Sequence, residues 1–158
     1  MNPSLVLLLA FLIGMVSGLR SLTAPALVSW AARLHWIDLR SSSLSFMGST
    51  VAVAAFSFLA LGELIADKLP FAPSRLQPPG LIARFTLGGL SGAGVAVAGG
   101  QSFAVGAVLG AVGGIAGAFA GYWARIGLVK AMRVPDIVIA LLEDAVAIAG
   151  GLFIVTRF

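Results

Sequence analysis

Two neighbouring carboxylates, Glu143 and Asp144, lie inside the apolar run "ALLEDAVAI" at residues 140–148. A second acidic pair, Glu63 and Asp67, has the i, i+4 spacing that places both side chains on one helix face. A charged side chain in the middle of a bilayer costs about 2.5–3.5 kcal/mol on insertion scales. Such a cost indicates either a functional role, such as binding a proton or a cation, or a buried partner.

Arginines are the natural partners of these acids. Arg20 lies in "GLRSLTAP", where a guanidinium, hydroxyl groups and a predicted helix start come together and can hold an anion or a carboxylate. The alternative is an arginine that extends to the bilayer edge. The predicted substrate- or ion-binding residues are Glu63, Asp67, Glu143, Asp144 and Arg20, with Arg84 and Arg125 as candidate ion-pair partners.

The amino-acid composition indicates an integral membrane protein. The chain has 158 residues, of which 59% are hydrophobic and only 10% charged, against about a quarter charged in an average soluble domain. The net charge of +4 comes from scattered basic residues, which indicates contact with lipid headgroups rather than nucleic acid. The absence of cysteine excludes disulfides and thiolate chemistry, and a single histidine excludes a poly-His metal centre. We predict no cofactor.

The sequence predicts one all-α transmembrane domain, a polytopic helix bundle with about five spans of bilayer length. The expected spans are 3–19, 47–67, 81–99, 103–124 and 135–156. The N-terminal segment is interpreted as a first span, because it lacks the basic region and cleavage site of a signal peptide. Residues 23–37 are too short to cross comfortably, so we expect a re-entrant or interfacial half-helix there.

Basic residues predict the orientation of the bundle. Loops 67–84 and 124–134 are rich in Lys and Arg, and they lie on one side because the intervening spans form a hairpin. The positive-inside rule makes that side cytoplasmic, in a bacterial plasma membrane. The side of the N-terminus depends on whether 23–37 crosses, and both alternatives stay open. Spans two and five then carry Glu63 and Glu143 at a similar depth, so these carboxylates are expected to converge.

Small residues mark the third and fourth spans. They recur at spacings of three and four, at Gly88, Gly92, Ala96 and Gly99 and at Gly106, Gly110, Gly113, Gly117 and Gly121. In lipid, where apolar surface gives no drive for helix association, small residues let backbones touch. The pattern predicts a tight hairpin of these two spans, or a seam between copies in a homo-oligomer.

Two long stretches carry a resemblance to a known family. "GELIADKLPFAPSRLQPPGLIARFTLGGLSGA" at 62–93 and "GYWARIGLVKAMRVPDIVIALLEDAVAIAGG" at 121–151 resemble a family of small bacterial integral membrane proteins of unknown function. The resemblance runs through Glu63, Arg84 and the acidic pair at 143–144. It implies a fold and no particular activity.

Two classes of function fit these residues. The first is a small secondary transporter or channel for a proton, a cation or a small solute, in which Glu63 and Glu143 bind and residues 20–37 form a gate or half-site. The alternative is a non-transporting scaffold or lipid-binding subunit whose acids pair with arginines. An enzyme is not predicted, because no nucleophile–base pair or metal-ligand spacing is present. We favour the transporter.

Overall fold

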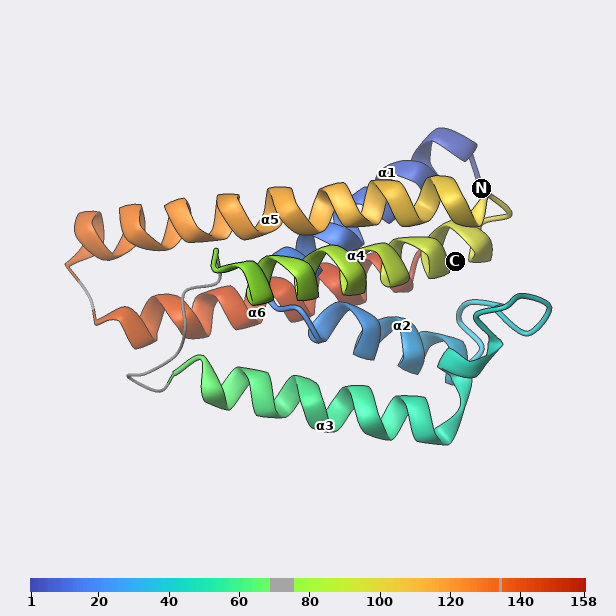
Figure 1. The fold of residues 1–158 in the computed structure, drawn as a ribbon, viewed down its shortest axis with the longest axis horizontal. Coiled ribbons are helices and arrows are strands. Elements are labelled where there is room, and N and C mark those ends of the chain that lie inside the picture. The colour runs from blue at the N-terminus through green and yellow to red at the C-terminus, as the bar shows by residue number, and fades with distance from the viewer. Residues whose placement is uncertain (69–75, 134) are drawn as a thin grey trace.

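The structure is a computed structural model that describes residues 1–68, 76–133 and 135–158. These residues form six α-helices and one 3-10 helix, η1, and Figure 1 shows a bundle of roughly antiparallel rods. The helices are α1 (Pro3–Leu19), α2 (Thr23–Arg33), η1 (Ser45–Gly48), α3 (Thr50–Ala66), α4 (Pro78–Ala98), α5 (Phe103–Met132) and α6 (Asp136–Val155). Helices α4, α5 and α6 are long and apolar enough to span a membrane, and α1 and α3 are shorter apolar helices. The predicted all-α membrane bundle is confirmed.

Three predicted boundaries differ from the structure by three residues or more, and the simplest is the third span, which begins at Pro78 rather than at 81. The second span begins at Thr50 rather than at 47, because the Ser49 hydroxyl caps α3 by accepting from the backbone N–H of Ala52 at 3.1 Å. The fourth span continues to Met132 rather than ending at 124, because good helix formers follow and no proline interrupts them. Part of the predicted loop 67–84 lies outside the described residues.

The two chain ends lie at the same end of the bundle. Met1, Trp36, Gly99 and Phe158 line one open pocket there, and we call this the terminal end. At the opposite end α1 turns into α2, and Figure 1 shows α5 and α6 continuing past that turn. We call residues 20–22 the α1–α2 junction.

Helix α2 is the half-helix expected within residues 23–37. It has 11 residues, about 16 Å at 1.5 Å per residue, and it runs from the junction back toward the terminal end (Figure 1). Residues 36 and 37 line the same pocket as Met1. The α2 segment and the residues that follow it therefore run from the junction to the terminal end of the bundle.

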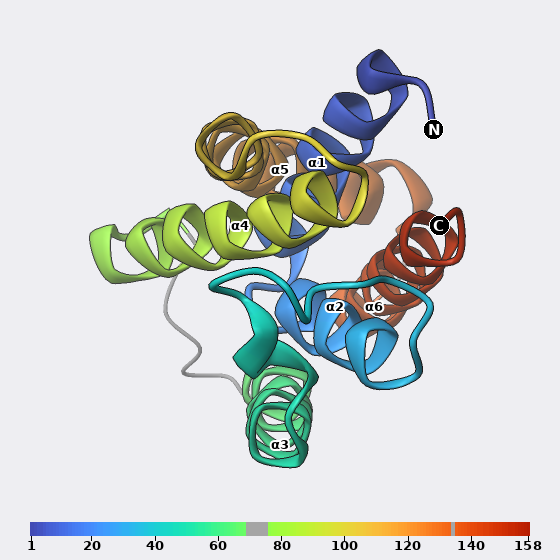
Figure 2. The ribbon, with the colours of Figure 1, turned by 90° about the vertical axis from the view of Figure 1, so that its right-hand side faces the viewer.

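Helices α1, α4 and α5 pack with their backbones in contact, and Figure 2 shows them grouped on one side of the bundle. A Cβ added at Gly106 would lie 2.7 Å from the carbonyl oxygen of Gly92, and one at Gly113 would lie 2.2 Å from that of Phe11. The small residues of α5 therefore serve two faces, one toward α4 and one toward α1. The association of copies through these helices stays a prediction.

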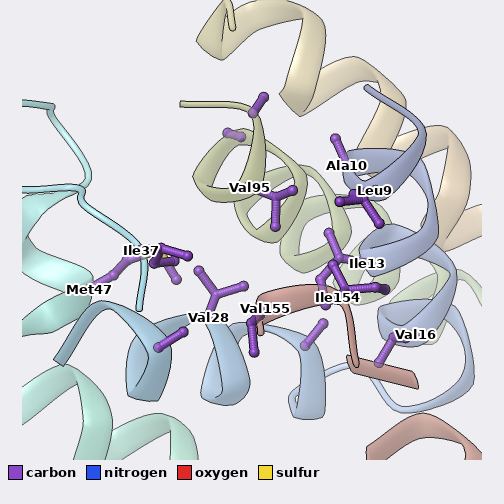
Figure 3. Close-up of a cluster of buried hydrophobic side chains, with 14 of the residues drawn as sticks. Leu9, Ala10, Ile13, Val16, Val28, Ile37, Met47, Val95, Ile154 and Val155 are labelled. Atoms are coloured by element: carbon purple, nitrogen blue, oxygen red, sulfur yellow. The ribbon is translucent and has the colours of Figure 1, made fainter. Parts of the chain in front are cut away.

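A hydrophobic cluster fills the interior of the bundle between the terminal end and the junction. Ile13, Val28, Val95 and Val155, from α1, α2, α4 and α6, are fully buried in it together with Met47 of η1. Figure 3 shows these side chains directed toward one another. The cluster anchors α2 within the bundle and leaves the polar junction at the other end of that helix.

Helix α3 is the outermost element of the bundle (Figure 2). It packs against α2 and η1, and the indole N–H of Trp30 donates to the Ser57 hydroxyl at 2.9 Å. Its outer face is apolar and exposed, including Val51 and Phe58, which are 79% and 78% exposed.

Candidate functional site

Arg20 is the centre of the candidate site. It ends α1 in an extended backbone conformation that turns the chain into α2, and its side chain is fully buried. Its Nε donates to Asp144 Oδ1 at 2.5 Å, its Nη1 donates to an Asp67 oxygen, and its Nη2 lies 3.6 Å from Glu143 Oε2. A fourth contact runs from Nη2 to the Ala140 carbonyl at 3.5 Å. One guanidinium thus connects the end of α3 with α6.

Two further cations extend these contacts. The Lys68 ammonium donates to Asp144 Oδ2 at 2.6 Å. The Arg125 guanidinium donates to both oxygens of Asp136, at 2.8 and 2.5 Å, and its Nη1 lies 3.7 Å from Glu143 Oε2. We call the whole set the charge network, and it consists of Arg20, Asp67, Lys68, Arg125, Asp136, Glu143 and Asp144.

The charge network leads from the interior of the bundle to its surface. The Arg20 side chain is 0% exposed and that of Glu143 is 8%, whereas those of Asp67 and Asp136 are 25% and 61% exposed. Removing one partner from a buried ion pair destabilises a protein by about 3–5 kcal/mol, because it leaves an uncompensated charge. The inner contacts of Arg20 are therefore the ones whose loss has a large effect.

Glu63 binds the backbone at the start of α2. Its Oε1 accepts from the backbone N–H and the hydroxyl of Ser21, and its Oε2 accepts from the backbone N–H of Leu22 at 2.8 Å. Helix α2 has no side-chain cap of its own, so a carboxylate from α3 supplies the cap and faces the positive end of the helix dipole. Glu63 and Asp67 together hold the α1–α2 junction.

Glu63 and Glu143 therefore both reach the junction, but through different partners. Glu63 binds the backbone of residues 21–22, and Glu143 lies beside Arg20 and Arg125. The i, i+4 spacing on α3 was a correct guide, since it delivers two carboxylates to consecutive residues of the junction.

Arg20 lies closer to Asp144 than to Glu143, both of which are predicted site residues. On an ideal helix Glu143 shares a face with Ala140 and Ala147. In the structure the buried face of α6 runs instead through Ala140, Asp144, Ala147 and Gly151. On this face a Cβ at Gly151 would lie 2.3 Å from a methyl carbon of Leu27, so α6 packs closely on α2 there.

The two candidate ion-pair partners, Arg84 and Arg125, bind different parts of the structure. Arg125 pairs with Glu143, as described above. Arg84 is buried, and its Nε donates to the Gly18 carbonyl at 2.9 Å while its Nη1 donates to the Gly80 carbonyl at 3.0 Å. Because the last carbonyls of a helix lack partners within it, Arg84 closes the end of α1 next to Arg20.

Sequence reasoning missed Lys68 and the pairing role of Asp136. Neither residue was among the predicted site residues or ion-pair partners. The available signal was position, since Arg125 and Asp136 lie on either side of the short α5–α6 connection and can face each other. Among the described residues, no group of three His, Asp or Glu side chains could hold a metal ion.

The fold and the charge network define an α-helical membrane protein whose first two helices meet at a buried ionic junction. The chain matches the family model "Domain of unknown function (DUF4126)" over residues 7–156. It belongs to this family, and the predicted membership in a family of unknown function is confirmed. Searches of curated proteins and of solved structures give no match.

Proposed function

We propose that this protein is a small secondary transporter of the bacterial plasma membrane for a proton, a cation or a small solute. In this proposal the charge network couples ion binding to a movement of α3. The observation that carries the proposal is the fully buried Arg20, held between carboxylates that come from the end of α3 and from α6. Buried ionisable groups at a broken helix are the kind of site that transporters use.

The coupling follows from the energetics of the Arg20 contacts. A proton or cation that neutralises Asp67 or Asp144 weakens one bond of a guanidinium that has no access to water. The loss of such a partner is worth about 3–5 kcal/mol. Since each 1.4 kcal/mol is a factor of about ten, this energy shifts an equilibrium between two arrangements by about two to four powers of ten. One ion therefore supplies enough energy to switch the network.

Helix α3 is the element that such a switch would release. Near the junction it is held by Glu63 on the α2 backbone, by Asp67 on Arg20 and by Lys68 on Asp144. Toward the terminal end it is held by its packing on α2 and η1. Breaking the polar contacts frees one end of α3 while the other stays attached, and this movement would expose the junction.

The proposed orientation places the junction in the cytoplasmic half of the membrane. Arg84, Arg125, Lys130 and Arg133 belong to the junction half of the bundle, in or next to loops 67–84 and 124–134, and the positive-inside rule assigns that half to the cytoplasm. Because Met1 and Phe158 line a pocket at the other end, both chain ends then lie on the outer side.

Flux through purified protein in liposomes tests the proposal. We expect wild-type protein to carry an H⁺, Na⁺ or K⁺ flux above that of empty liposomes. Asp144→Asn and Asp67→Asn, which keep the size and remove the charge, should lower this flux by about tenfold or more, since they change about 1.4 kcal/mol or more in the network. Asp38→Asn is the matched control, because Asp38 is an exposed acid outside the network, and it should retain wild-type flux.

Two results would overturn transport. One is a wild-type flux equal to that of empty liposomes, and the other is an equal flux in wild type and Asp144→Asn. A folded, monodisperse sample of each variant, checked by gel filtration, keeps the comparison valid. Lys68→Gln adds an independent variant, because it removes one of the two cations on Asp144 and leaves Arg20 in place.

One observation favours the alternative of a scaffold or lipid-binding subunit. Both oxygens of Asp144 are engaged, one by Arg20 and the other by Lys68, as in a permanent structural tie between α1, α3 and α6. In that case Asp144→Asn lowers the thermal midpoint of unfolding, and no form of the protein carries flux.

A further inference from the structure

An open pocket with a volume of about 510 Å³ lies at the terminal end, opposite the charge network, and the transport proposal does not use it. The segment after α2, the α4–α5 turn and the end of α6 form its walls. Its lining includes Trp36, Asp38, Gly99, Gly100, Arg157 and Phe158. Helices α4 and α6 end at Ala98 and Val155, so the pocket lies at the ends of two helices that are long and apolar enough to span a membrane.

Arg157 supplies an available cation to this pocket. Its guanidinium carbon lies 3.9 Å from the centre of the Phe153 ring, which holds the side chain in place. No carboxylate of the described residues pairs with it. The planar N–H fork of a guanidinium matches the oxygen atoms of a phosphate group. A phosphate is therefore the anion that this side chain suits best.

Asp38 supplies an anion to the same pocket. The backbone N–H and the Nε of Arg40 both donate to its Oδ1, at 3.0 and 3.3 Å. These bonds hold the pKa of the Asp38 carboxyl below its usual value, so the group stays ionised at neutral pH. Among the described residues no donor binds Oδ2, which leaves this oxygen available to a ligand ammonium.

The pocket also has an aromatic side chain of the kind found where lipid headgroups meet water. Trp36 lines the pocket and is 43% exposed. Tryptophan is enriched where lipid headgroups meet water, because its ring is apolar and its N–H is polar. The pocket therefore combines an interfacial aromatic side chain with one cation and one anion.

We propose that this pocket binds the phosphoethanolamine headgroup of a membrane phospholipid, with Arg157 on the phosphate and Asp38 on the ammonium. A glycerol headgroup offers Asp38 no cation. A choline headgroup offers a cation without N–H donors, so it forms no hydrogen bond with the carboxylate. The two charges of the pocket thus select a zwitterionic headgroup that ends in a primary amine.

Native mass spectrometry of the detergent-purified, full-length chain tests this proposal. Dioleoyl lipids with ethanolamine, choline or glycerol headgroups are supplied at equal concentration. We expect wild type to retain the ethanolamine lipid about tenfold more than the other two, the effect of one charge-assisted hydrogen bond. Asp38→Asn should bind all three lipids equally, and Arg157→Gln should lose all three. Arg33→Gln changes an exposed arginine that does not line the pocket, and it should behave as wild type.

Two outcomes would overturn the proposal. One is equal retention of the three lipids by wild type, and the other is a preference that survives both Asp38→Asn and Arg157→Gln. Free phosphoethanolamine distinguishes headgroup recognition from acyl-chain binding. It should displace the bound lipid, whereas a lipid that stays bound under saturating competitor contradicts recognition through the headgroup. Since both variants change exposed side chains far from the charge network, neither should affect ion flux.

Discussion

At the residue scale, Arg20 combines three bonding directions that no other side chain offers. Its Nε, Nη1 and Nη2 face Asp144, Asp67 and Glu143 respectively. A guanidinium holds such a fork in one plane, whereas a lysine ammonium is a compact point charge at the end of a flexible chain. A mutation should therefore separate the effect of the charge at residue 20 from the effect of the shape of its guanidinium group.

Arg20→Lys keeps the charge and removes the fork, so at least one carboxylate loses its partner. We expect the free energy of unfolding to fall by about 3 kcal/mol, the lower end of the range for breaking a buried ion pair. Denaturation by SDS in mixed micelles measures this change. Arg40→Lys is the control, because Arg40 and Asp38 form an exposed pair, and its unfolding midpoint should equal that of wild type. Equal midpoints for Arg20→Lys and wild type would contradict the structural role of the fork.

At the scale of elements, backbone contact between α1, α4 and α5 makes these helices the fixed part of the bundle. A Cβ at Gly88 would lie 2.6 Å from the Gly110 carbonyl oxygen, and one at Gly117 would lie 2.3 Å from that of Met15. Close packing of this kind allows little relative movement. Helix α3 lacks such contacts with the three helices, which is why we assign the movement to it.

Gly113→Ala tests this packing. The new Cβ would lie 2.2 Å from the Phe11 carbonyl oxygen, so α1 and α5 must separate, and we expect a destabilisation of about 1–3 kcal/mol. Gly127→Ala, in the same helix, has nothing within 4 Å of the new Cβ. It should be neutral or stabilising by up to about 1 kcal/mol, because alanine favours a helix. Thermal unfolding of both variants in the same detergent gives the comparison, and equal midpoints would argue against backbone contact at Gly113.

At the scale of the whole molecule, the course of the chain predicts which segments share a side of the membrane. The chain contains no cysteine, so single cysteines report accessibility directly. In intact cells we expect an impermeant maleimide to label Ser43→Cys and Ser102→Cys, which lie at the terminal end. Lys130→Cys should be labelled only after permeabilisation. Labelling of Ser43→Cys and Lys130→Cys from the same side would contradict the crossing of α2 and its following segment.

Much of this arrangement could be predicted from the sequence. Hydropathy identified the helices, and charges inside apolar runs identified Arg20 and the acids around it. The pairing could not be predicted, because Glu143 and Asp144 lie about 100° apart on a helix and the rotation of α6 depends on its contacts with other helices. The Glu63 cap was also beyond reach, since it depends on where the backbone of residues 21–22 turns. The sequence therefore shows which charged residues lie in apolar segments, whereas the tertiary contacts determine which of them pair.

The long separation between the partners of Arg20 has a consequence for biosynthesis. Arg20 and Asp144 are 124 residues apart, and ribosomes add about 5–20 residues per second, so Arg20 waits about 6–25 s for its α6 carboxylates to be made. Its place at the end of α1 allows the guanidinium to reach the lipid headgroups during that time. The contacts of the α1–α2 junction are therefore completed only after α6 has been synthesised. A nascent chain that stalls before residue 143 therefore leaves Arg20 paired with Asp67 and without its two α6 carboxylates.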